Sequence, residues 1–145
     1  MPARNTEQLE NALKQAVDLK KFLDDNEENF QKFTLAEYLK HLLAKKNLTM
    51  TQVIRDSQLG TYAYQIFYGN KKTSREYVLS LAFAMRLSPH ETDYLLYYAG
   101  HKKLYPRSKW DSVIFFALTN HKNLLETNEM LAEFKLSPLL GRLID

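Results

Sequence analysis

Few side chains in this chain of 145 residues have the types and spacing that catalysis or metal binding requires. The chain has no cysteine, which excludes disulfides, thiolate zinc sites and cysteine nucleophiles. No serine lies in a nucleophile-elbow pattern, and the four glycines stand apart, so none belongs to a phosphate-binding loop. The histidines lack the i, i+4 pairing of metal ligands and are expected to be surface or loop residues: His41, His90, His101 and His121. We therefore expect no enzymatic activity and no metal or other cofactor.

The charged residues suggest a different chemistry, the binding of a polyanion. Residues 34–110 contain 12 Lys/Arg against 5 Asp/Glu, a balance of +7. Residues 1–33 (5 against 7) and 111–145 (3 against 5) each have a balance of −2. A basic middle between acidic flanks is typical of a face that meets a polyanion such as nucleic acid. A solvated surface of lysine and arginine is the alternative, and charge alone does not decide between them.

Length and composition indicate one compact soluble domain, or a small domain with an appendage. Hydrophobic residues make up 45% of the chain and charged residues 26%, as in ordinary globular proteins. No run approaches the ~18 apolar residues that a membrane span requires. The polar N-terminal residues are not followed by the apolar core of a signal peptide. A cytoplasmic location is the default expectation.

Apolar residues recur at helical spacing, which predicts an all-α fold. Four pairs match the capping box that begins a helix: Thr34–Glu37, Thr49–Gln52, Thr73–Glu76 and Ser88–Glu91. A surface helix is expected over about residues 6–24, with Leu9, Leu13, Ala16, Val17 and Lys20 on one stripe, followed by an acidic linker. Further helices are expected at about residues 34–46, 49–58, 61–68, 73–85, 89–99, 110–118 and 127–136.

Two of these expected helices, at residues 49–58 and 61–68, are short and follow each other directly. Isolated helices of this length are unstable in water, so longer neighbours must hold them. A helix-turn-helix uses such packing to present its second helix to the major groove of DNA.

The segment from Asn47 to Leu96 carries a resemblance to a known family. It reads NLTMTQVIRDSQLGTYAYQIFYGNKKTSREYVLSLAFAMRLSPHETDYLL and resembles helix-turn-helix regulators of the Cro and phage-repressor class (the xenobiotic-response-element type). The resemblance implies a repressor-like bundle of five helices over residues 34–100. An N-terminal helix and linker (1–33) would precede it, and a C-terminal helical extension (101–145) would follow. It also implies a transcriptional regulator, a repressor of this class, that binds double-stranded DNA. We expect a homodimer, with a possible protein partner at the N- or C-terminal helices.

The same resemblance implies roles for particular residues. Side chains at the start of the first short helix would contact phosphates: Thr49, Thr51 and Gln52. The second short helix would present an outward side to the groove, formed by Thr61, Tyr62, Tyr64, Gln65 and Tyr68. Gln65 is the expected base reader, because a glutamine amide can form two hydrogen bonds with adenine. Asn70, Lys71 and Lys72 follow this helix, where the family meets the DNA backbone.

The chain departs from the family pattern at several positions. Met50 and Gln58 stand where members usually carry Gln and Gly, and the turn is one residue shorter than usual. The second short helix has no Arg or Lys, so direct readout is expected to be weak or to favour A·T pairs. Its tyrosines are also typical of protein-binding surfaces. The alternative function is a protein-interaction adaptor or antitoxin-like regulatory subunit on the same fold.

The C-terminal extension has features that the bundle does not explain. Trp110, Val113 and Ile114 occupy one face of their helix, which leaves Phe115 and Phe116 on another. A helix that is apolar on two faces is either sandwiched or part of an oligomer interface. The preceding basic loop, residues 101–109, is a second candidate for phosphate contacts, with a solvated loop as the alternative.

Overall fold

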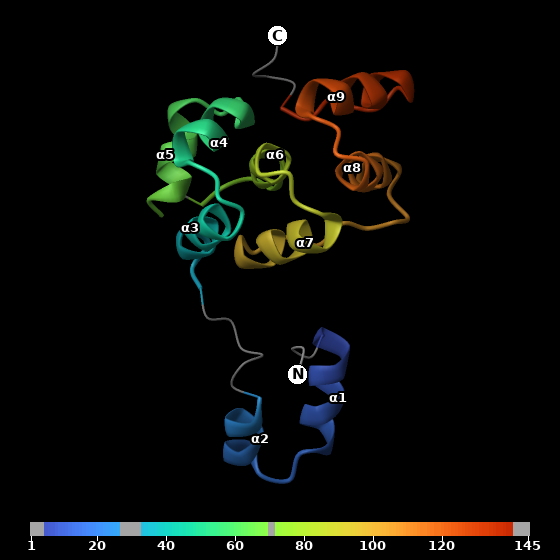
Figure 1. Cartoon of the computed structure of the whole chain (residues 1–145). Helices are drawn as coiled ribbons and strands as arrows, with labels where there is room; N and C mark the ends of the chain where they lie inside the picture. Colours follow the sequence, from blue (N-terminus) through green and yellow to red (C-terminus); the bar gives the residue numbers. More distant parts are fainter. Residues whose placement is uncertain (1–4, 27–32, 70–71, 141–145) are drawn as a thin grey trace. The chain divides into compact units, whose positions relative to one another are not determined.

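The computed structural model describes residues 5–26, 33–69 and 72–140, which contain nine α-helices and no strand (Figure 1). The all-α prediction is therefore confirmed for these residues. The chain divides into two compact units, residues 1–32 and 33–145, and each is described by itself. No helix among the described residues is long and apolar enough to cross a membrane.

The first unit contains two helices where the sequence predicted one. They are α1 (Thr6–Gln15) and α2 (Leu19–Asp25). The break arises because Asp18 takes an extended conformation, and its carboxylate accepts hydrogen bonds from the amides of Lys20 and Lys21, which starts a new helix. The predicted stripe is therefore divided, because Ala16 and Val17 lie between the two helices and Lys20 belongs to α2.

The second unit is built around α6 (Arg75–Ala84), whose residues from Val78 to Ala84 are all buried. Four helices lie around it in the first part of the unit: α3 (Leu35–Lys45), α4 (Met50–Ser57), α5 (Thr61–Phe67) and α7 (Pro89–Tyr98). Helix α4 packs on α6 and α5, and α3 packs on α5 and α7. These contacts support the two short helices, as the sequence required.

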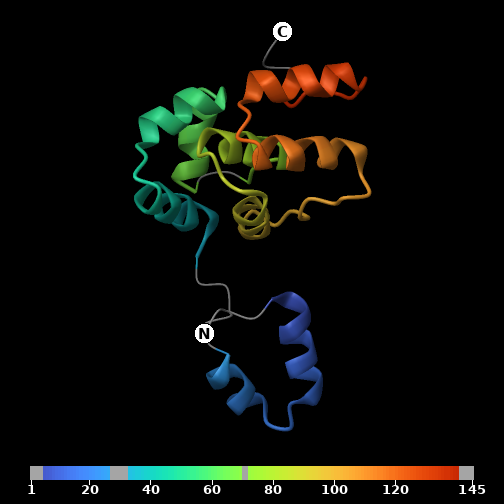
Figure 2. The same cartoon turned by 45° about the vertical axis from the view of Figure 1, so that its right-hand side comes forward.

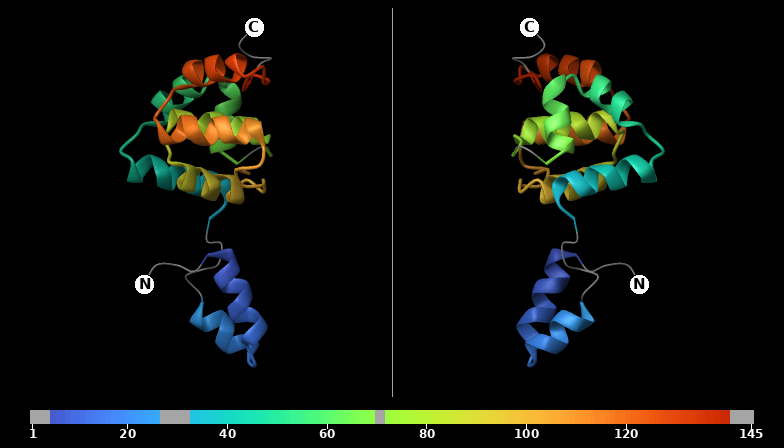
Figure 3. Two further views of the ribbon diagram at one scale, coloured as in Figure 1. Left: turned by 90° about the vertical axis from the view of Figure 1, so that its right-hand side faces the viewer. Right: turned by 90° about the vertical axis from the view of Figure 1, so that its left-hand side faces the viewer.

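The last two helices are α8 (Lys109–Thr119) and α9 (Leu124–Glu133), which pack on each other. Helix α8 also contacts α7, and α9 contacts α6, so the C-terminal extension shares a compact unit with the preceding helices. Figures 2 and 3 show α8 and α9 side by side, across α6 from α5. The Trp110 indole nitrogen donates to the Ser137 carbonyl (2.8 Å), which holds the start of α8 against the segment that follows α9.

Helix starts agree with the predicted capping boxes in part. The boxes at Thr34 and Ser88 are confirmed in both directions, and Thr49 caps α4 by accepting from the Gln52 amide. The predicted Thr73 box is wrong, because Ser74 caps α6 and Thr73 is buried. Helix α9 starts earlier than predicted, where Asn123 and Glu126 form a capping box.

Candidate nucleic-acid interface

The turn between α4 and α5 sets how the two helices meet. It spans three residues, of which Gln58 and Gly60 both have positive φ (62° and 61°). Between them Leu59 is 6% exposed and joins the core, which fixes the turn to the body of the unit. The short turn therefore holds α4 and α5 against each other.

Helix α5 has one buried side and one exposed side. Ala63, Ile66 and Phe67 are almost wholly buried, with 0–1% of their surface exposed. Thr61, Tyr64 and Tyr68 face away from them, and Tyr64 and Tyr68 are 38% and 58% exposed. The two tyrosine rings stack, with centroids 6.4 Å apart and an interplanar angle of 21°. The exposed side thus carries a threonine hydroxyl and a stacked pair of phenols.

Two of the predicted outward residues lie at the flanks of α5 instead. Tyr62 is half-buried: its hydroxyl donates to the Lys72 carbonyl (3.2 Å), and its ring meets Tyr77 edge-on with centroids 4.7 Å apart. Gln65 is also half-buried, and its Oε1 is buried without a hydrogen-bond partner in the described part of the chain. An unpaired buried oxygen costs free energy of folding.

Helix α4 contributes the start of its first turn. Thr51 and Gln52 are exposed, and Thr49 is exposed although its hydroxyl accepts a hydrogen bond from the Gln52 amide (3.2 Å). The N-terminus of an α-helix carries partial positive charge that favours anions. Lys72 is exposed just before α6, whereas Asn70 and Lys71 lie outside the described residues.

Part of the positive charge that the sequence concentrates in residues 34–110 has a structural role. The Arg75 guanidinium holds the buried Asp111 carboxylate in a bidentate pair (2.8 and 3.0 Å) and donates to the carbonyls of Lys102 and Lys103. Lys46 pairs with Glu91 at 3.0 Å. Neither pair could be predicted from the sequence, because the two partners of each pair lie far apart in the chain.

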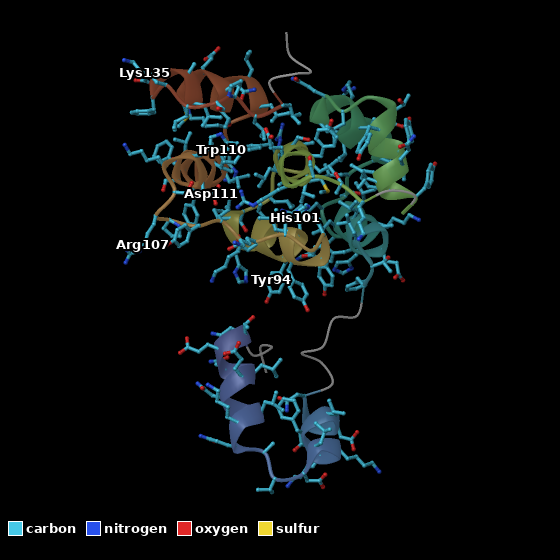
Figure 4. All side chains as sticks on the ribbon, turned by 180° about the vertical axis from the view of Figure 1, so that it is seen from behind. Tyr94, His101, Arg107, Trp110, Asp111 and Lys135 are labelled. Carbon is cyan, nitrogen blue, oxygen red and sulfur yellow. The ribbon has the colours of Figure 1, made fainter. Side chains whose placement is uncertain are left out.

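The basic loop that follows α7 begins near the start of α6, where His101 lies 2.7 Å from the Thr73 carbonyl, and runs to the far edge of the unit. Figure 4 shows Arg107 at the edge of the unit next to α8, while α5 lies on the other side of α6. The loop is anchored there by Arg75 and by the Leu104 amide, which donates to Asp93 (2.8 Å). Arg107 is therefore not part of the surface that α4 and α5 form.

Tyr38 on α3 is a titratable residue that packs against α7. Burial raises the pKa of Tyr38 to about 12, with Tyr98 and Glu91 nearby adding to the shift. Tyr38 stacks on His41 and lies 4.5 Å from Tyr98, centroid to centroid, between α3 and α7. No group of three His, Asp or Glu side chains is placed to hold a metal ion in the ranges that the structure describes.

A scan of family models, a search of curated proteins and a search of solved structures each find no match for this chain.

Proposed function

We propose that this protein is a DNA-binding transcriptional regulator in which α4 and α5 act as a helix-turn-helix within a repressor-like bundle. The observation that supports this most is the division of α5 into a buried apolar side and an exposed side with Thr61, Tyr64 and Tyr68. Hydroxyl groups of threonine and tyrosine bind both phosphates and base edges. The exposed start of α4 and Lys72 flank this side and supply contacts to the DNA backbone.

The charges on α5 limit the ways in which it can bind DNA. Helix α5 carries no Arg or Lys, so the guanine contacts that arginine usually makes are absent from it. Binding then depends on a small number of phosphate contacts and on A·T-rich sites. Each neutralised phosphate contributes about −0.9 to the slope of log affinity against log salt concentration.

The test is a fluorescence-anisotropy titration of the full chain with a labelled mixed-sequence duplex at several salt concentrations. Lys72→Ala should weaken binding to all sequences alike and reduce the salt slope by about 1. Lys135→Ala removes the same charge from an exposed position beyond α9, far from α5 (Figure 4), and should leave both quantities unchanged. Equal effects of the two substitutions would contradict the proposed docking side.

A second function, protein-interaction adaptor, is favoured by one observation. Tyr64 and Tyr68 form an exposed stacked pair, and tyrosine is enriched at protein interfaces. The same titration separates the functions, because an adaptor would show no duplex binding even at low salt. A selection of duplexes from a random pool then reports the sequence preference of a DNA-binding protein.

A further inference from the structure

A cavity of about 360 Å³ lies where the end of α4, the end of α6 and the start of α9 meet. All three helices belong to the second unit, and α4 and α9 both pack on α6. Cavities of this order of size are typical of sites that bind small molecules. The side chains on its lining indicate which chemistry it accepts.

The accessible lining of this cavity is mostly polar. Five of its residues are polar or charged: Arg55, Asp56, Gln58, Arg86 and Asn123. The apolar lining residues are largely covered, as the exposed fractions of Phe83 (6%) and Leu124 (4%) show, and among them only Leu125 is exposed. Such a lining suits a hydrophilic ligand, because an apolar one would leave these polar groups without water or hydrogen bonds.

The two arginines on the lining are available to an anion. Arg86 is exposed and forms no ion pair or hydrogen bond within the described ranges of the chain. Arg55 bonds Asp56 through its Nε alone (3.3 Å), so its two terminal nitrogens have no partner among the described residues. Two arginines against one aspartate give the lining a balance of +1. Guanidinium groups bind phosphate through paired hydrogen bonds.

The start of α9 adds partial positive charge to the same lining. Asn123 caps this helix, and its side chain accepts a hydrogen bond from the Glu126 amide (2.8 Å). The amides of Leu124 and Leu125 come before the first amide that bonds within the helix, and both residues line the cavity. Free amides at a helix start favour anions, including phosphate. The Glu126 carboxylate accepts from the Asn123 amide, and Glu126 is not part of the lining.

We propose that this cavity binds a small hydrophilic molecule that carries a phosphate group. The phosphate lies between the guanidiniums of Arg55 and Arg86, at the start of α9. Two guanidiniums from different elements match the several oxygens of a phosphate, whereas one guanidinium already occupies both oxygens of a carboxylate. Gln58 and Asp56 then bind hydroxyl groups on the rest of the molecule.

The first experiment titrates the ¹⁵N-labelled full chain with inorganic phosphate, and with sodium chloride at the same ionic strength and pH as the control. Phosphate should shift the amides of Gln58, Arg86 and Leu125 to saturation, with a dissociation constant on the order of 1 mM. Sodium chloride should leave these amides in place. Shifts that do not saturate, or that are equally large in the basic loop 101–109, would indicate an adventitious ion only and overturn the proposal.

Substitution of the arginines tests the assigned contacts. Arg55→Gln and Arg86→Gln should each weaken phosphate binding about tenfold, because each removes one guanidinium and its charge. Arg107→Gln removes the same charge from an exposed position at the edge of the unit next to α8 (Figure 4) and should bind phosphate like the wild type. Glutamine suits the positive φ of Arg86 (54°), since Gln58 has the same conformation (62°). Equal affinities of the wild type and all three variants would contradict the proposal.

A phosphate ester tests the rest of the cavity. Glycerol 3-phosphate should bind about fivefold more tightly than inorganic phosphate, which is the effect of one ordinary hydrogen bond. Gln58→Gly, which suits the positive φ at this position, should remove that gain and leave the affinity for inorganic phosphate unchanged. Equal affinities of the wild type for the two compounds would contradict a site built for a larger molecule than phosphate.

These titrations contain no DNA, so their result is independent of the proposed function. A short duplex added at the end distinguishes a small molecule from the phosphates of a DNA backbone. The duplex should leave the phosphate-induced shifts of Arg86 and Leu125 in place. Displacement of the bound phosphate would assign the two arginines to the DNA backbone and overturn the proposal.

Discussion

Gln65 occupies a position that stability alone does not explain. Its Oε1 is buried and has no hydrogen-bond partner among the residues that the structure describes, while its neighbours Ile66 and Phe67 are fully buried apolar residues. An apolar side chain of similar size would avoid the cost of burying an unpaired oxygen. Buried polar groups that lower stability in this way are commonly found at functional sites. The half-buried amide at the edge of the exposed side of α5 is thus consistent with the proposed role in reading a base.

Replacing Gln65 measures how much the unpaired oxygen lowers the stability of the fold. Gln65→Met should raise the free energy of unfolding by about 1 kcal/mol, because it removes the unpaired oxygen and keeps an unbranched side chain of similar length. Urea unfolding followed by circular dichroism measures this change. Gln52→Met places the same change at an exposed position of α4 and should shift stability by less than about 0.5 kcal/mol. A destabilised Gln65→Met variant would show that the amide makes a favourable interaction in the folded state.

At the scale of the elements, one ion pair connects α3 to α7. Lys46 lies at the end of α3 and bonds Glu91 in the first turn of α7 at 3.0 Å. Burial by itself raises the pKa of Glu91, but hydrogen bonds from Ser88 and Lys46 outweigh it and leave that pKa below the ordinary value of 4.5. The pair therefore stabilises the folded chain only while Glu91 is ionised.

The pH dependence of stability follows from this shift. Because the pKa of Glu91 is lower in the folded chain, its contribution is fully present above pH 4.5 and is lost as the pH falls through the lowered value. Glu91→Gln should unfold more easily than the wild type at pH 7, and the difference should shrink as the solution is acidified. Thermal unfolding of both proteins across this range measures it. A difference that stays constant with pH would contradict the assigned role of the Glu91 charge.

Local sequence signals predicted most helix starts and ends of the second unit to within one residue. Thr34 and Ser88 cap helices as predicted, because a capping box needs only residues three apart. Five helices are followed by a residue of positive φ that is not glycine: Asn47, Gln58, Arg86, His121 and Lys135. Tertiary packing sets these ends, since the next residue or two must return the chain to the core.

The candidate interface was predictable to a similar extent. Helical periodicity correctly separates the buried Ile66 and Phe67 from the exposed Tyr64 and Tyr68. Periodicity does not predict that Tyr62 and Gln65, at the flanks of α5, are half-buried, because their burial depends on which residues pack beside the helix. The Arg75–Asp111 pair was unpredictable for the same reason, since 36 residues separate its partners in the chain.

At the scale of the whole second unit, the C-terminal helices lie away from the proposed DNA-binding surface. Figures 1 to 3 show α8 and α9 across α6 from α5. A duplex bound along the exposed side of α5 should therefore leave α8 and α9 without contacts to it.

The central claim is that the exposed side of α5, with the start of α4, contacts duplex DNA. Nuclear magnetic resonance of the ¹⁵N-labelled full chain tests it most directly, by comparing amide shifts with and without a short duplex at low salt. The account predicts shifts at Thr51, Gln52, Thr61, Tyr64 and Tyr68, and unchanged amides along the middle of α8. Shifts confined to α8 and α9, or no shifts at all, would contradict it.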